Sequence, residues 1–183
     1  MDNEKKLVMA CIRKEAGSLD ALYHMFSSRM FGICLRYAGN RMEAEDLLHD
    51  GFIKVLGNLK KFRFEGSFDG WMRRLMVNTA INNYRKKSIR VEQDLDSKET
   101  AEIPLESKQD ALSELSAGEL MELVQNLPEG YRMVFNLYVI EGYKHQEIAQ
   151  MLDVTESTSK TQLAKARKQL QLAVKNLYHE PAV

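Results

Sequence analysis

The chain has 183 residues, and its 26 basic and 26 acidic side chains give a formal net charge of zero. This length fits one domain or two small ones, and a charge-rich composition with three prolines favours an all-α protein. No apolar run approaches the roughly 20 residues of a membrane span. The N-terminus lacks a signal-peptide pattern, so we expect a cytoplasmic protein without a membrane contact.

Apolar residues repeat at helical spacing through the first part of the chain. This pattern predicts three helices, over residues 1–15, 19–38 and 41–60. Ser18 is the expected N-cap of the second helix, and Gly39 with Asn40 should end it in a left-handed conformation. Cys11 and Cys34 lie inside apolar segments without a second cysteine at metal-ligand spacing, so we expect both to be buried free thiols.

The outer face of the predicted helix 41–60 is acidic. Glu43, Asp46 and Asp50 follow a spacing of i, i+3 and i+7 and therefore share one side, together with His49. Three interpretations are open: a solvated face, a docking surface for a basic partner, or a site for a divalent metal and phosphodiester chemistry. No matching pair of carboxylates on another helix favours the metal site.

Aromatic and basic side chains alternate in the stretch Lys60–Arg90, which includes Trp71, the only tryptophan. Phe62, Phe64 and Phe68 stand where a polar turn is expected. Aromatic planes next to cations suit unstacked bases on a charged backbone, and apolar rings in an exposed loop are typical of a binding site. The stretch therefore indicates a single-stranded nucleic acid as the partner.

A fourth helix is predicted from Phe68 to Arg90. Helical spacing turns one side toward a core, formed by Phe68, Trp71, Met72, Leu75 and Thr79. A polar stripe runs beside it, formed by Arg74, Asn78, Asn82 and Arg85. Amide and guanidinium groups can pair with base edges or phosphates. A solvated basic face on an amphipathic helix is the alternative.

Residues 91–111 show no periodicity and are acidic, which predicts a flexible linker between two small helical domains, 1–90 and 112–183. The second domain should hold helices ending at Pro128, over 131–140 and over 143–152, and a last one capped by Thr155. A short helix, a turn at Asp153 and a longer helix with a basic face form a helix-turn-helix pattern, although a plain helical hairpin is the alternative. The side chains expected near DNA are Glu156, Ser157, Thr158, Lys160, Thr161 and Lys165.

Three groups of residues form one pattern by their order and spacing along the chain. They are AEDLLHDGF at 44–52; FRFEGSF at 62–68 leading into WMRRLMVNTA at 71–80; and LPEGYR at 127–132 with GYKHQEIA at 142–149 and KTQLAKAR at 160–167. In order and spacing they resemble the extracytoplasmic-function (ECF) group of bacterial RNA polymerase sigma factors, over nearly the whole chain. The resemblance implies a region 2 domain that docks on core polymerase and melts the −10 promoter element, and a region 4 domain that reads the −35 element.

The resemblance also implies roles for individual residues. Core polymerase would be bound by Glu43, Asp46, Leu47, His49 and Asp50. The −10 element would be bound by Phe62, Arg63, Phe64, Ser67, Trp71, Arg74, Asn78, Asn82 and Arg85. The −35 element would be bound by Glu156, Ser157, Thr158, Lys160, Thr161, Lys165 and Arg167. No catalytic residue, metal or cofactor is implied.

The implied partners are core RNA polymerase and promoter DNA, both as duplex and as the non-template single strand, with an anti-sigma factor as a further candidate. We expect the free protein to be a monomer. Two other functions compete: a dimeric repressor or activator that uses the helix-turn-helix, and a metal-dependent nuclease built on Glu43, Asp46 and Asp50.

The chain departs from the family pattern at a few positions. His49 replaces the usual glutamine of the docking helix, and Gly51 replaces a bulky residue, which suggests tight packing there because glycine inside a helix costs about 1 kcal/mol relative to alanine. Asp153 stands where the helix-turn-helix turn usually has glycine, and aspartate tolerates a left-handed backbone better than most residues. The stretch Thr155–Ser159 is more polar than is common.

Overall fold

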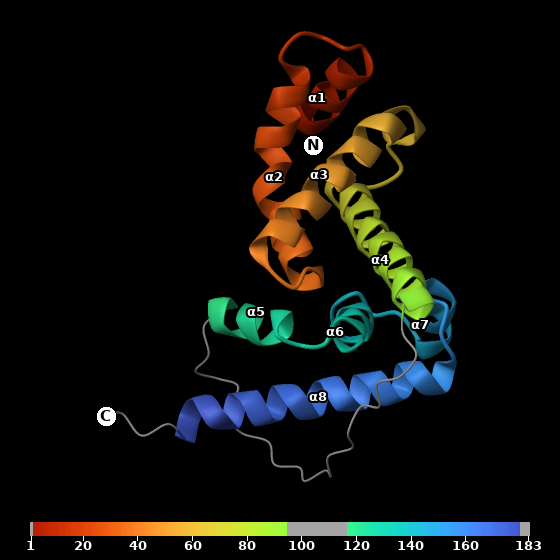
Figure 1. Ribbon diagram of the computed structural model, residues 1–183. Helices are drawn as coiled ribbons and strands as arrows, with labels where there is room; N and C mark the ends of the chain where they lie inside the picture. Colours follow the sequence, from red (N-terminus) through yellow and green to blue (C-terminus); the bar gives the residue numbers. More distant parts are fainter. Residues whose placement is uncertain (1, 95–116, 180–183) are drawn as a thin grey trace. The chain divides into compact units, whose positions relative to one another are not determined.

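The computed structural model describes residues 2–94 and 117–179, and all regular structure within them is helical, as the sequence predicts (Figure 1). The chain divides into two compact units, Met1–Ala80 and Ile81–Val183. Most of the predicted linker 91–111 lies outside the described residues. Its first residues, 91–94, continue the fourth helix.

The first unit contains α1 (Asp2–Ile12), α2 (Ser18–Tyr37), α3 (Arg41–Asn58), the short 3₁₀ helix η1 (Leu59–Lys61) and the beginning of α4 (Phe68–Asp94). In Figure 1 α2 lies beside both α1 and α3, and it packs against both. The predicted helices are therefore confirmed, with ends that differ by a few residues.

The helix ends in this unit differ from the sequence prediction. Gly17, with φ 74°, is the N-cap of α2, whereas Ser18 is the first helical residue and donates its hydroxyl hydrogen bond to the Glu15 carbonyl at 2.7 Å. Asn40 does not end α2 in a left-handed conformation. It is the extended N-cap of α3, and its side-chain oxygen accepts from the Glu43 amide at 2.9 Å. Capping α3 satisfies one of that helix's unpaired amides, which explains the extended backbone at Asn40.

The core of the first unit is built from aromatic and methionine side chains. Phe26 of α2 and Phe68 of α4 are fully buried, and their ring centroids lie 5.4 Å apart. Met72 and Met76 continue this core along α4. Leu56 of α3 is 39% exposed and lies outside this core.

At Gly51, α3 packs closely against the side chain of Met76. A Cβ atom added at this position would overlap the sulfur of Met76, which is itself fully buried. The tight packing suggested by the sequence is therefore confirmed. A bulkier residue on the inner side of α3 would force Met76 out of its place.

Both cysteines are buried free thiols, as predicted. Burial raises the pKa of Cys34 to about 12, and burial likewise raises the pKa of Cys11 above its ordinary value. The Cys11 thiol donates a hydrogen bond to the Ser18 carbonyl at 3.2 Å. Neither thiol is in the nucleophilic thiolate form at neutral pH.

The second unit contains α5 (Ala117–Gln125), α6 (Glu129–Phe135), η2 (Asn136–Ile140), α7 (His145–Leu152) and α8 (Glu156–His179). Residues 112–116, at the beginning of the predicted second domain, lie outside the described residues. In Figure 1 α8 is the long helix of this unit, and α6 and α7 pack against it.

The segment η2 is a π-helix that continues α6. The Glu141 amide donates to the Asn136 carbonyl at 3.0 Å, five residues earlier, and Gly142 then ends the helix with φ 78°. A π-turn holds an extra residue and rotates the side chains that follow by about 100° relative to a regular helix. Tyr138, within η2, is half-buried.

We predict that Gly51→Ala destabilises the first unit by about 1 kcal/mol, because overpacking costs more than the gain in helix propensity. Urea unfolding followed by the fluorescence of Trp71, the only tryptophan, measures this unit. Gly32→Ala on α2 is the matched control. A Cβ there meets open space, so this change should stabilise the unit by up to about 1 kcal/mol. Equal effects of the two changes would contradict the packing at Gly51.

Candidate nucleic-acid interface

The loop between η1 and α4 carries aromatic rings from the core to the surface. The ring of Phe62 lies 5.2 Å from Phe68 and 5.4 Å from Trp71, and the ring of Phe64 lies 4.8 Å from Phe62. Phe68 is fully buried, whereas the other rings are half-buried. Phe68 is therefore the anchor of the loop. Its predicted place on the core side of the fourth helix is confirmed, whereas its prediction as a ring available to a ligand is wrong.

Phe64 has a left-handed backbone, with φ 58°. For a residue with a bulky side chain this conformation costs about 1 to 2 kcal/mol. Strained backbones of this kind concentrate at binding sites, where the surrounding structure holds them in place. The shape of the loop is thus set before any ligand arrives.

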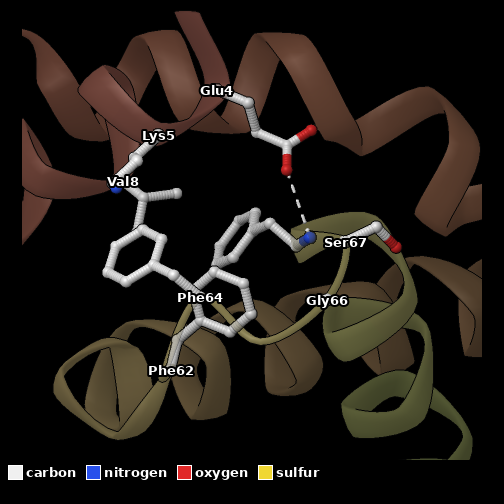
Figure 2. Close-up of a pocket in the computed structure, with 8 residues that line it drawn as sticks. Glu4, Lys5, Val8, Phe62, Phe64, Gly66 and Ser67 are labelled. Carbon is white, nitrogen blue, oxygen red and sulfur yellow. Dashed lines mark hydrogen bonds between the residues drawn. The ribbon is translucent and has the colours of Figure 1, made fainter. Parts of the chain in front are cut away.

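Two cavities flank this loop. The first has a volume of about 660 Å³ and is lined by Glu4, Lys5, Val8, Phe62, Phe64, Gly66, Ser67 and Phe68 (Figure 2). The second has about 460 Å³ and is lined by Lys61, Phe62, Arg63, Glu65, Gly66, Ser67, Gly70, Trp71 and Arg74. The second cavity combines aromatic planes with several cationic side chains, which suits a base and its phosphate.

The polar stripe of α4 is exposed along its whole length. Its members Arg74, Asn78, Asn82 and Arg85 all face solvent, whereas Thr79 is fully buried and donates its hydroxyl hydrogen bond to the Leu75 carbonyl at 2.7 Å. The basic residue Arg63 and the hydroxyl of Ser67 at the loop are exposed as well. These side chains can reach a nucleic-acid strand without moving the core.

The turn between α7 and α8 has the backbone expected from the sequence. Asp153 adopts a left-handed conformation with φ 59°, and the amides of Asp153 and Val154 both donate to the Ala149 carbonyl. Thr155 caps α8, since its hydroxyl oxygen accepts from the Thr158 amide at 3.0 Å. The predicted turn and cap are confirmed, and they give the geometry of a helix-turn-helix.

The first turns of α8 present a polar outer face. Ser157, Lys160, Thr161 and Arg167 are exposed, and Thr158 and Lys165 are partly so. The Lys160 ammonium lies 2.7 Å from the exposed Glu156 carboxylate, and this hydrogen bond lowers the pKa of Glu156. Ser159 and Leu163 are buried, and α8 packs against α6 and α7.

His145 joins α7 to α8 and η2. Its Nδ1 atom lies 2.9 Å from the buried Ser159 hydroxyl, and its ring stacks on Tyr138 with centroids 4.5 Å apart. The guanidinium of Arg167, on α8, lies 5.8 Å from the centroid of the Tyr138 ring. Burial, followed by the neighbouring Lys160 charge, lowers the pKa of His145 below its ordinary value.

The outer face of α3 is mixed rather than simply acidic. Asp46, His49 and Asp50 are exposed, Glu43 is half-buried with a carboxylate that accepts from the Gly39 amide at 3.0 Å, and Leu47 lies in the core with 6% exposed.

Exposed apolar side chains run among these acids. Met42 is 70% exposed and Ile53 is 61% exposed. Neither side chain was predicted as part of the docking surface. Their spacing could have indicated one stripe, since Met42, Asp46, His49 and Ile53 lie at i, i+4, i+7 and i+11.

Within residues 2–94 and 117–179, no three His, Cys, Asp or Glu side chains are placed to hold a metal ion together, and Glu43, Asp46 and Asp50 form no such group. The nuclease alternative therefore gains no support from the geometry of α3. Over the same residues, none of the helices combines the length and apolar character that a membrane crossing requires.

Two family models match the chain: sigma-70 region 2 over residues 22–89 and sigma-70, region 4 over residues 117–170. Together they span about two thirds of it. The chain is 24% identical to the ECF RNA polymerase sigma factor SigW of Bacillus subtilis, over 94% of this chain and 97% of the relative. The chain is an ECF sigma factor.

Other relatives of this sigma factor agree in length as well as in sequence. The RNA polymerase sigma-H factor of Pseudomonas aeruginosa is 25% identical to it, over 98% of this chain and 97% of the relative. Among solved structures, the sigma factor RpoE in complex with the anti-sigma factor NepR from Bartonella quintana matches with a TM-score of 0.49 and 17% identity, over 87% of this chain and 98% of that one.

We predict that acidification from pH 7.5 to pH 5.5 removes the contribution of His145 to stability. Because the pKa of His145 is lowered by folding, the unfolded chain binds a proton first, near its ordinary pKa of about 6.5, and stability falls below that pH. Thermal unfolding of the wild type and of His145→Gln across this range measures the effect. The difference in midpoint should shrink toward low pH, and a difference that stays constant would contradict the assignment.

Proposed function

We propose that this sigma factor binds core RNA polymerase through the outer face of α3 and directs initiation at specific promoters. Region 2 selects the −10 element as an unpaired non-template strand, and region 4 reads the −35 element as duplex. The observation that carries the proposal is the strained aromatic loop beside an exposed stripe of arginine and asparagine on α4. The cytoplasm is the proposed location.

The loop and α4 have the chemistry that an unstacked strand requires. A base flipped from the duplex costs a few kcal/mol, and stacking on an aromatic side chain returns about 1 to 3 kcal/mol per base. Trp71 and Phe62 supply the planes, while Arg63 and Arg74 supply the charge at the second cavity. Since the two energies nearly cancel, the polymerase must supply the remaining free energy of melting.

The exposed face of α8 supports duplex recognition by region 4. A recognition helix enters the major groove with its first turns, where Ser157, Lys160 and Thr161 are exposed. The contact between Lys160 and Glu156 orients the ammonium group. A carboxylate in this position can also accept a hydrogen bond from the exocyclic amine of cytosine, so the pair suits selection as well as affinity.

The outer face of α3 supports docking on the polymerase. Met42 and Ile53 offer apolar area for an interface core, and Asp46 with Asp50 adds negative charge for a basic partner. An anti-sigma factor that covers such surfaces is a further proposed partner. In this function the protein selects a start site and acts without catalysis of its own, as a monomer when free.

The proposal as a whole is tested by transcription in vitro. Core polymerase with this sigma factor, given genomic DNA, should start transcripts at a restricted set of sites that share upstream sequences, whereas core polymerase alone should not. Permanganate should detect unpaired thymines at these sites only when both components are present. The absence of specific starts, or an open bubble with the sigma factor alone, would refute the proposal.

Docking is tested separately with Asp50→Lys. We predict that this charge reversal abolishes capture of core polymerase in a pull-down, because an exposed positive charge replaces a negative one in the interface. Asp20→Lys, an equal reversal at an exposed position of α2, is the matched control and should retain capture. Unchanged capture by the Asp50 variant would remove α3 from the interface.

A further inference from the structure

The cavity shown in Figure 2 is formed by two distant parts of the sequence. One wall is the loop with Phe62 and Phe64, and the other is α1 with Glu4, Lys5 and Val8. Helix α1 ends at Ile12, whereas the region 2 model begins at residue 22. Neither matched family segment therefore assigns a function to these α1 residues.

Glu4 makes a specific bond to the beginning of α4. Its Oε1 atom accepts from the Phe68 amide at 3.1 Å, across 64 positions of sequence (Figure 2). This amide is among the first of α4 and has no partner within the helix, so a carboxylate satisfies it and also matches the positive end of the helix dipole. The Ser67 hydroxyl accepts from the Gly70 amide at 3.1 Å, which leaves the Phe68 amide to Glu4.

Lys5 acts on the other end of the loop. Its ammonium nitrogen lies 5.5 Å from the centroid of the Phe64 ring, within the range of a cation–π contact. Phe64 is the residue with the left-handed backbone. Helix α1 therefore contacts the loop at its strained residue and at its junction with α4.

A strained loop persists only when its surroundings hold it. Val8 of α1 is fully buried against the same cavity, so α1 is fixed to the first unit by its core and not only by polar contacts. The loop in turn holds Phe62, which borders both cavities. A change in the position of Phe68 or Phe64 would thus alter the aromatic surface offered to a base.

We propose that α1 is part of the single-strand site, with Glu4 as the positioning residue that holds the loop Phe62–Ser67 in the shape that receives an unstacked base. This inference rests on the proposed function of region 2. Glu4 acts through the Phe68 amide and the loop rather than through a contact of its own with DNA. The preorganised loop binds without first paying the cost of ordering.

The expected effect of removing Glu4 on DNA affinity is opposite to the effect that electrostatics alone predicts. Removing a carboxylate from a DNA-binding surface normally strengthens binding, since it reduces repulsion of the phosphates. Loss of the hydrogen bond between Glu4 and the Phe68 amide should instead weaken DNA binding. Glu4→Asp keeps the charge and shortens the side chain by one methylene, so it should lose reach to the Phe68 amide. Glu4→Gln loses the charge and keeps an oxygen that can accept.

The experiment measures the affinity of the full chain for a fluorescein-labelled single-stranded DNA of 12 nucleotides and mixed sequence, by anisotropy. We expect Glu4→Ala and Glu4→Asp to weaken binding about fivefold, the scale of one hydrogen bond, and Glu4→Gln to restore most of the affinity. Asp20→Ala, at an exposed acid of α2, should bind as tightly as wild type or more tightly.

The Trp71 emission of the free proteins provides a second readout. It should shift in Glu4→Asp and much less in Glu4→Gln, because the Trp71 ring lies 5.4 Å from the Phe62 ring of the loop. Urea unfolding monitored at Trp71 checks that each variant is folded. A Glu4→Asp protein that binds and emits like wild type would overturn the proposal.

If region 2 does not bind a single strand at all, the measurements give a different pattern. If the wild type binds no single strand, or if Trp71→Ala binds as tightly as wild type, region 2 does not act as proposed. If Trp71→Ala abolishes binding while all three Glu4 variants match the wild type, only the positioning role of α1 is wrong.

Discussion

The burial of Phe68 is the contact on which the first unit depends. Its ring packs on Phe26 in the core and stacks on Trp71 at 5.4 Å, so it ends the loop and begins α4 at the same fixed point. The ring of Phe62 packs against Phe68 on the side nearer the surface. The unit can therefore keep half-buried aromatic rings at its surface, which would otherwise collapse or aggregate, because they are attached to a rigid interior.

In the proposed function, this anchoring explains how a small net free energy of base binding can still give selection between bases. Base flipping and base stacking nearly cancel, so a loop that had to be ordered on binding would lose affinity to its own entropy. In this loop, the free-energy cost of the left-handed backbone at Phe64 is covered when the unit folds, before any strand binds. In the proposed function, the affinity of the loop for a strand then depends mainly on the difference between one base and another.

Features that depend on local residue types were predicted correctly from the sequence, whereas features that depend on long-range contacts were not. Apolar spacing located the helices, and the cap at Thr155 and the left-handed Asp153 followed from the residue types themselves. The prediction failed where a tertiary partner decided the outcome. Asn40 caps α3 instead of ending α2, and residues 136–140 form a π-helix within the helix predicted over 131–140. Glu4 bonds to Phe68 across 64 positions, and no local pattern marks such a pair.

The two cysteines have a consequence for how such a protein can be regulated. They are the only thiols of the chain, both are covered, and burial keeps them protonated. Oxidants attack thiolates that solvent can reach, so mild oxidation leaves both cysteines unmodified while the first unit is folded. A disulfide or sulfenic-acid signal would therefore have to form on another molecule, or on this chain after its first unit has opened.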